Sequence, residues 1–150
     1  MNPDRLHTIK LNWSYPRLVE NVSNSEYASR HGIYLISRVF GGKESYIYVG
    51  KTERPFSQRL WEHQNKDFSP WTQKRGIWRV RFCDVHKEGF DDALLIDCIE
   101  SAVIHSLIEK GIKTLTNTSK VRSCTVHYPL RVICKGYRGA VPPSYLFIPD

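Results

Sequence analysis

GIYLISRVF (residues 32–40) is followed after a short gap by SYIYVG (residues 45–50). Both stretches are rich in β-branched and aromatic residues, which is typical of strands. Gly41-Gly42 lies between them and is a turn signal, so the two stretches predict a β-hairpin. The register stays open at this stage. A loop with an odd number of residues would place Tyr34 and Tyr48 on the same face.

The segments after the hairpin predict two helices with a strand between them. Arg54-Pro55 opens a short helix that runs to about Asn65, because proline is tolerated in a first helical turn. Residues 76–85 alternate, with Trp78, Val80 and Phe82 on one face and Arg79 and Arg81 on the other, which predicts a half-buried strand. A long helix then begins at Asp91 or Asp92 and continues to about Glu109, before Gly111.

This order of elements predicts an α+β fold, namely a small three-stranded antiparallel sheet flanked by helices. The core is expected to span residues 30–120. Residues 1–29 are read as an N-terminal extension, and residues 121–150 as a C-terminal extension packed on the core. Residues 124–150 contain four prolines and predict a strand followed by an irregular tail.

The composition favours a globular domain with an anionic partner. Hydrophobic residues make up 41% of the chain, charged residues make up 25%, and the net charge is +7. A basic surplus favours polyanions such as nucleic acid, although charge alone names no reaction. No apolar run approaches the roughly 20 residues of a membrane span, and the first thirty residues lack the apolar stretch of a signal peptide. A cytoplasmic protein is therefore expected. Its four cysteines form no CxxC pair, which predicts reduced thiols rather than a zinc site.

Glu100 is the most informative single residue of the chain. Helical winding of residues 93–108 places it within an apolar arc formed by Ala93, Ile96, Val103, Ile104 and Leu107. A carboxylate on a buried arc costs several kcal/mol unless it is paired, protonated or bound to a metal ion. Two interpretations stay open: a metal ligand or catalytic acid, and a structural ion pair with a buried arginine.

Arg59 and His63 stand four residues apart, so both project from one face of the short helix. An arginine offers a fork of donors that suits a phosphate, and a histidine can hold or pass a proton near neutral pH. A solvated helix face would show the same spacing. Tyr34 and Tyr48 taken alone are ordinary sheet aromatics.

Taken together, these residues resemble the GIY-YIG nuclease superfamily. Gly32-Ile33-Tyr34 matches the first half of the family signature, and Tyr48-Val49-Gly50 matches the second half. The ordered set continues through Lys51-Thr52, Arg59, His63, Glu100 and Asn117. The resemblance covers roughly residues 30–118. Valine replaces isoleucine in the second motif, and the gap between the motifs is slightly long, which a longer hairpin loop around Gly41-Gly42 would absorb.

The resemblance implies a metal-dependent endonuclease that hydrolyses phosphodiester bonds. It assigns one Mg²⁺ to Glu100, for which Mn²⁺ can substitute, and it makes Tyr34 the residue that helps to activate the attacking water. It implies that Arg59 contacts the scissile phosphate, that Tyr48 and His63 orient the water or relay protons, and that Asn117 buttresses the site. A tyrosine can act as a base only if nearby cations such as Lys51 lower its pKa.

The substrate implied by the resemblance is DNA, either duplex or branched, with Lys51, Arg79, Arg81 and Asn117 as substrate-binding residues. A compact restriction-type enzyme that acts as a homodimer is the preferred form, and repair, homing and structure-specific nucleases are further members of the family. The alternative is a catalytically silent nucleic-acid-binding module of the same fold. A protein-interaction domain is the third class, and it would leave Arg79 and Arg81 as a solvated strand face.

Overall fold

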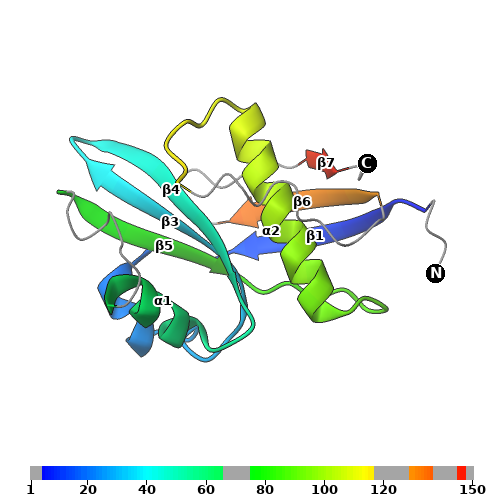
Figure 1. Cartoon of the computed structure of the whole chain (residues 1–150), viewed down its shortest axis with the longest axis horizontal. Helices are drawn as coiled ribbons and strands as arrows, with labels where there is room; N and C mark the ends of the chain where they lie inside the picture. The colour runs from blue at the N-terminus through cyan, green and yellow to red at the C-terminus, as the bar shows by residue number, and fades with distance from the viewer. Residues whose placement is uncertain (1–4, 66–74, 117–128, 137–144, 148–150) are drawn as a thin grey trace.

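The computed structural model describes residues 5–65, 75–116, 129–136 and 145–147. In chain order, the elements are β1 (His7–Trp13), β2 (Arg17–Leu18), the 3-10 helix η1 (Val19–Asn24), β3 (Gly32–Phe40), β4 (Lys43–Thr52), α1 (Phe56–Asn65), β5 (Ile77–Cys83), α2 (Asp92–Glu109), β6 (Leu130–Gly136) and β7 (Tyr145–Phe147) (Figure 1). The α+β class is confirmed. Within the described residues, no helix has the length and apolar character needed to cross a membrane.

The strands form two sheets, so the expectation of one three-stranded sheet is wrong. One sheet has four strands in the order β2-β5-β3-β4, and its described pairs are antiparallel. The other has three strands in the order β1-β6-β7, with β1 and β6 parallel. The hairpin, the strand β5 and both helices appear where the sequence predicted them. Asp91 caps α2 by accepting a hydrogen bond from the Leu94 amide at 3.1 Å.

The hairpin of β3 and β4 contains a β-bulge that sets the direction of its side chains. The loop has only two residues, Gly41 and Gly42, both with positive φ, so the expected longer loop is wrong. Ser37 pairs with Tyr46 whereas Ile36 pairs with Tyr48, which leaves Ile47 as the extra residue. One extra residue reverses the alternation beyond it. The bulge therefore brings Tyr48 onto the face that carries Tyr34.

The second sheet joins the two ends of the chain. Ile9, Leu11 and Trp13 alternate with more exposed residues along β1 and are buried. Their strand pairs in register with β6, from His7 opposite Leu130 to Trp13 opposite Gly136. The predicted extensions 1–29 and 121–150 therefore contribute neighbouring strands to one sheet.

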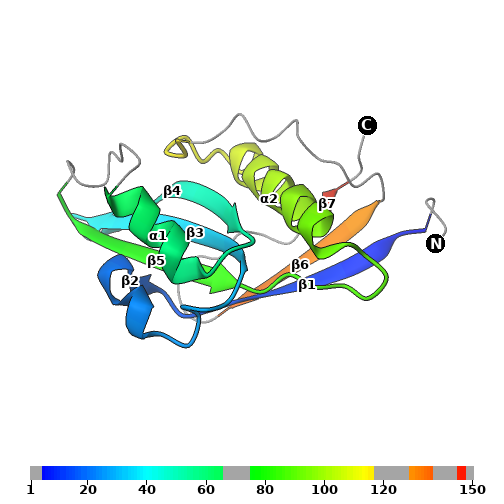
Figure 2. The ribbon, with the colours of Figure 1, turned by 60° about the horizontal axis from the view of Figure 1, so that its bottom comes forward.

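Two apolar clusters occupy the two faces of the four-stranded sheet. The larger, here called the main core, contains Ile33, Leu35 and Val49 of the sheet together with buried residues of β1, β6 and α2. Figure 2 shows α2 lying over β6 and β1. The smaller, here called the α1 core, contains Tyr34, Phe56 and Leu60 with residues of η1 and β5. Side chains that alternate along β3 thus enter two different cores.

Candidate active site

Tyr34 and Tyr48 lie beside each other on the α1 side of the four-stranded sheet. Their ring centroids are 6.0 Å apart and their planes differ by 22°. The Tyr34 ring is completely buried, and Phe56 of α1 packs on it at a centroid distance of 5.2 Å. The two tyrosines therefore share one face, although the hairpin loop has an even number of residues.

The glycines of the two motifs are both required by close packing. A Cβ on Gly50 would overlap the tip of the Tyr34 ring, which lies directly over this position on the neighbouring strand. A Cβ on Gly32 would overlap the carbonyl oxygen of Cys83 on β5. Because only glycine lets the backbone approach this closely, the motif residues at both ends of the hairpin have a steric explanation.

Arg59 is the cation beside the two tyrosines. Its helix is anchored at the start because the amides of Phe56 and Ser57 donate to the carbonyls of Arg30 and Ala28. Burial raises the pKa of Tyr34 well above its ordinary value, and the charge and side-chain hydrogen bond of Arg59 offset only part of this rise. Burial likewise raises the pKa of Tyr48, against the opposing charge of Arg59. Both phenols are therefore protonated at neutral pH.

Glu62 forms a hydrogen bond with Arg59 on the same helix. Its Oε2 accepts a hydrogen bond from Arg59 Nη1 at 3.2 Å. Arg54 donates to both carboxylate oxygens of Glu62, at 2.6 Å and 2.7 Å. The hydrogen bond from Arg54 is the main cause that lowers the pKa of Glu62, so this carboxylate is ionised at neutral pH. Glu62 is a site residue that sequence reasoning missed, although its spacing of three from Arg59 is the usual signal of a helix pair.

Glu100 lies on α2 and is buried, with 2% of its surface exposed. Its predicted neighbours Ile96, Val103, Ile104 and Leu107 are buried too, whereas Ala93 is exposed, so that member of the predicted arc is wrong. Besides burial, the negative charge of Glu100 raises the pKa of Tyr34 and of Tyr48. The carboxylate therefore acts electrostatically on the same site as Arg59.

Lys51 of β4 contacts α2 through an ion pair with Asp97. Its Nζ donates to Asp97 Oδ1 at 2.6 Å. Burial lowers the pKa of Lys51, but the hydrogen bond and charge of Asp97 and the charge of Glu100 outweigh this and raise it overall. The cation that lowers the pKa of Tyr34 is Arg59, rather than Lys51 as expected. Asp97 was missed as well, although it stands one helical turn before Glu100.

A metal ion beside Glu100 would find few protein ligands in the described part of the chain. Among the residues that the structure describes, no group of three or more His, Cys, Asp or Glu side chains could hold a metal ion. Mg²⁺ keeps several waters and often takes only one or two protein carboxylates. Glu100 fits as the single protein ligand of such an ion, because Asp97 already pairs with Lys51.

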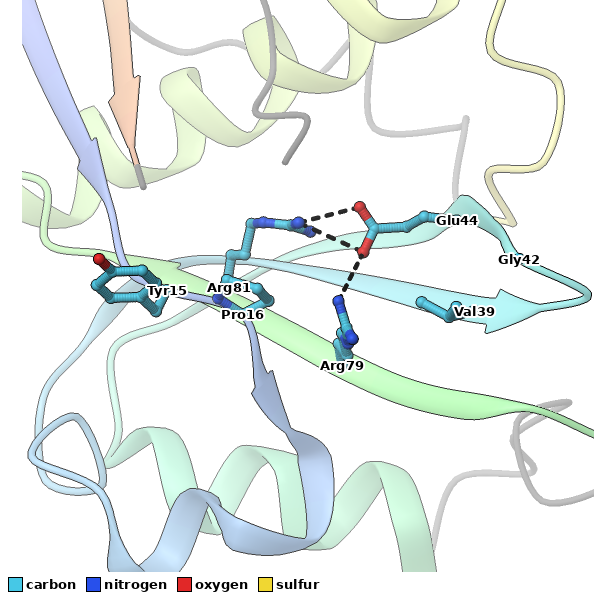
Figure 3. Close-up of a pocket in the computed structure, with 7 residues that line it drawn as sticks. All are labelled: Tyr15, Pro16, Val39, Gly42, Glu44, Arg79 and Arg81. Carbon is cyan, nitrogen blue, oxygen red and sulfur yellow. Dashed lines mark hydrogen bonds and ion pairs between the residues drawn. The ribbon is translucent and has the colours of Figure 1, made fainter. Parts of the chain in front are cut away.

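Arg79 and Arg81 lie on the opposite face of the sheet from the two tyrosines. They pair across β3 with Ser37 and Leu35, whereas Tyr34 pairs with Phe82 on the other face. Arg81 is 1% exposed and bound to Glu44, so it does not lie on the solvated strand face that a protein-interaction domain would have left. Figure 3 shows both guanidinium groups, from β5, directed toward Glu44 on β4.

Two predicted site residues lie outside the part of the chain that can be described in atomic detail. Asn117 falls in the gap after residue 116, and His63 belongs to the last turn of α1 with a side chain outside the described set.

Comparisons of the chain with protein-family models, with curated proteins and with solved structures found no match. The geometry of Tyr34, Tyr48, Arg59, Glu100 and Lys51 is therefore the basis for assigning a function.

Proposed function

We propose that this protein is a metal-dependent DNA endonuclease of the GIY-YIG type, which hydrolyses phosphodiester bonds. One observation carries the proposal. The rings of Tyr34 and Tyr48, from β3 and β4, lie 6.0 Å apart, and Arg59 from α1 and Glu100 from α2 both act electrostatically on them. Their types and their order along the chain are those that the resemblance to this superfamily implied.

Each residue of the cluster has a distinct task in this proposal. Arg59 binds oxygens of the scissile phosphate with its planar fork and offsets the negative charge that grows there during the reaction. Tyr34 and Tyr48 keep their protons in the free protein. Tyr48, which is partly exposed, orients a water or a phosphate oxygen by donating from Oη, and the buried Tyr34 stacks beside it. Lys51 adds positive charge next to Glu100 and is held by Asp97.

Glu100 would hold Mg²⁺ or Mn²⁺. A bound ion of this kind supplies positive charge that stabilises the leaving oxygen and lowers the pKa of metal-bound water. Tyr34 could accept a proton only after losing its own. Burial opposes this loss by raising the pKa of the phenol, and a neighbouring cation favours it by lowering the pKa. In the free protein, this phenol therefore stays protonated.

The proposed substrate is DNA, either duplex or branched, and the proposed biological form is a restriction-type enzyme that acts as a homodimer. The net charge of +7 supports a polyanionic substrate. Plasmid DNA incubated with the protein tests the function directly. We expect nicking or linearisation with Mg²⁺ and none after chelation. Intact plasmid that the protein nevertheless binds would indicate a catalytically silent nucleic-acid-binding module.

Arg59→Lys should reduce cleavage by about 100-fold, which agrees with the loss of one charge-stabilising donor group in other enzymes. Lysine keeps the charge but cannot make two parallel hydrogen bonds to phosphate. Single-turnover cleavage rates with saturating protein measure this effect. Gln58→Lys, one position earlier on the exposed side of α1, is the control and should cut at the wild-type rate. Near-normal cleavage by Arg59→Lys would remove Arg59 from the site.

Glu62→Gln should lower the cleavage rate by about tenfold with little effect on DNA affinity. The expected cause is that Arg59 loses an ionised partner that fixes its orientation beside the tyrosines. Glu62→Asp should recover part of the rate, since it restores the charge. A fall in stability without any change in the rate would make Glu62 a purely structural residue.

Tyr46→Phe tests the buried hydroxyls of the sheet through the pH dependence of stability. Burial raises the pKa of Tyr46 to about 12, so its contribution to stability is complete below pH 10 and is lost as the pH rises through about 12. Its hydroxyl is buried and has no hydrogen-bond partner within the described part of the chain. The unfolding free energy of the wild type should fall between pH 9 and pH 11.5. We expect the fall in Tyr46→Phe to be smaller by roughly 1–2 kcal/mol, because the titrating hydroxyl is absent. Urea unfolding measures this, and an equal fall in unfolding free energy for the variant and the wild type would contradict it.

A further inference from the structure

A pocket of about 400 Å³ lies on the face of the four-stranded sheet that is turned away from Tyr34 and Tyr48. It is bounded by the hairpin end of β3 and β4, by β5 and by the segment between β1 and β2 (Figure 3). Its lining residues are Tyr15, Pro16, Val39, Gly42, Glu44, Arg79 and Arg81. The proposed nuclease chemistry does not use this pocket.

Arg81 is the feature that distinguishes this pocket from an ordinary surface hollow. Its side chain is 1% exposed, and its Nη2 donates to Glu44 Oε1 at 3.0 Å and to Oε2 at 3.3 Å. Its Nε and Nη1 are buried and have no acceptor among the residues that the structure describes. Buried donors without an acceptor cost free energy, and those of a charged group cost more than neutral ones. An acceptor supplied by a ligand in the pocket would satisfy them.

The charges around the pocket favour an anion. Arg79 Nη1 lies 4.0 Å from Glu44 Oε2 and is partly exposed. Two guanidinium groups thus share one carboxylate, which leaves a net positive charge beside the pocket. Ser37 Oγ also donates to Glu44 Oε2, at 3.1 Å, so this carboxylate is held in place. Glu44 therefore acts as an internal anion that satisfies only part of the donor set.

The geometry points to a phosphate group as the external ligand. We infer that this pocket binds a phosphate, through Arg79 and Arg81, at a site separate from the cluster of Tyr34, Tyr48, Arg59 and Glu100. Arginine forks match phosphate oxygens in pairs. The volume is at the lower end of the range for small-ligand sites, and the half-exposed ring of Tyr15 offers a surface on which a nucleotide base can stack.

Two sources share this ligand chemistry, namely the DNA backbone and a free nucleotide or inorganic phosphate. Titrations in metal-free buffer with inorganic phosphate, a deoxynucleoside monophosphate and a short single-stranded oligonucleotide distinguish them. Cleavage is not part of this assay, so failure here is separate from failure of the proposed nuclease function. We expect Arg79→Gln to weaken binding of the preferred probe by about tenfold. Arg131→Gln, which removes an exposed charge on β6, is the matched control and should weaken it less than twofold.

Glu44→Gln gives the second and sharper readout. Without the internal carboxylate, Arg81 loses its ionised partner, so the variant should melt at a lower temperature than the wild type in the absence of phosphate. Added phosphate should then narrow this gap, because the variant lacks the carboxylate that competes with phosphate and should bind it more tightly. A ligand that binds the folded state stabilises it by an amount that grows with the logarithm of its concentration over its Kd. A constant gap at all phosphate concentrations would overturn the inference. Equal losses of binding in Arg79→Gln and Arg131→Gln would overturn it as well, since general charge would then explain the binding.

Discussion

Glu100→Gln is expected to reduce DNA cleavage by about 1000-fold or more while leaving the protein folded. The substitution keeps the shape of the side chain and removes the charge that would bind Mg²⁺, so the positive charge at the leaving oxygen is lost with it. Glu100 is 2% exposed, so deleting its charge also removes a desolvation cost. Thermal stability in metal-free buffer should therefore stay the same or rise, and affinity for DNA should be retained.

The matched control is Glu109→Gln, which makes the same chemical change on the exposed last turn of α2. It should cut DNA at the wild-type rate. A structural ion pair predicts the reverse pattern for Glu100→Gln, with a loss of several kcal/mol in unfolding free energy and continued cleavage. Urea unfolding and a single-turnover cleavage assay on these two variants distinguish the interpretations. A destabilised Glu100→Gln variant that still cuts would end the metal-ligand assignment.

The parts of the fold that follow from local patterns were predictable from the sequence. α2 was expected from Asp91 or Asp92 to Glu109, and it begins at Asp92 with Asp91 as its cap. Caps, apolar periodicity and the Gly41-Gly42 turn act over a few residues, so a single sequence contains them in full. The burial of Glu100 also follows from periodicity, because the residues around it are apolar at helical spacing.

The second sheet depends on a pairing that no local pattern contains. β1 shows the alternation of Ile9, Leu11 and Trp13, but its partner β6 lies more than one hundred residues away in the chain. The burial of Arg81 was not predictable for a related reason. Alternation along β5 identifies two faces, but whether the second face is covered depends on distant segments and on Glu44. The face that carries Arg79 and Arg81 forms a wall of a pocket.

The bulge at Ile47 is the detail of the candidate site that was least accessible to sequence reasoning. Two strands joined by a two-residue turn would leave Tyr34 and Tyr48 on opposite faces, and the extra residue in β4 corrects this. Whether a hairpin contains a bulge depends on packing against both cores. The sequence could therefore supply the residues of the site, whereas the tertiary packing brings them together.

Gly50→Ala is expected to destabilise the protein by about 1–3 kcal/mol and to reduce cleavage sharply. The added Cβ would overlap the tip of the Tyr34 ring, which is completely buried and held by Phe56, so the ring cannot move away without displacing its neighbours. Overpacking of a dense core has a cost of this size. Urea unfolding gives the first quantity, and single-turnover cleavage gives the second.

A double-mutant cycle identifies Tyr34 as the cause. In a Tyr34→Leu background the aromatic tip is absent, so adding Gly50→Ala should cost less than about 0.5 kcal/mol, and the two substitutions should be strongly non-additive. In a Tyr34→Phe background the ring remains and only the hydroxyl is lost, so most of the cost should persist. If Gly50→Ala destabilises all three backgrounds equally, the cost arises from the backbone of β4. The glycine of the second motif would then have no steric connection to Tyr34, because its effect on stability would not depend on the Tyr34 ring.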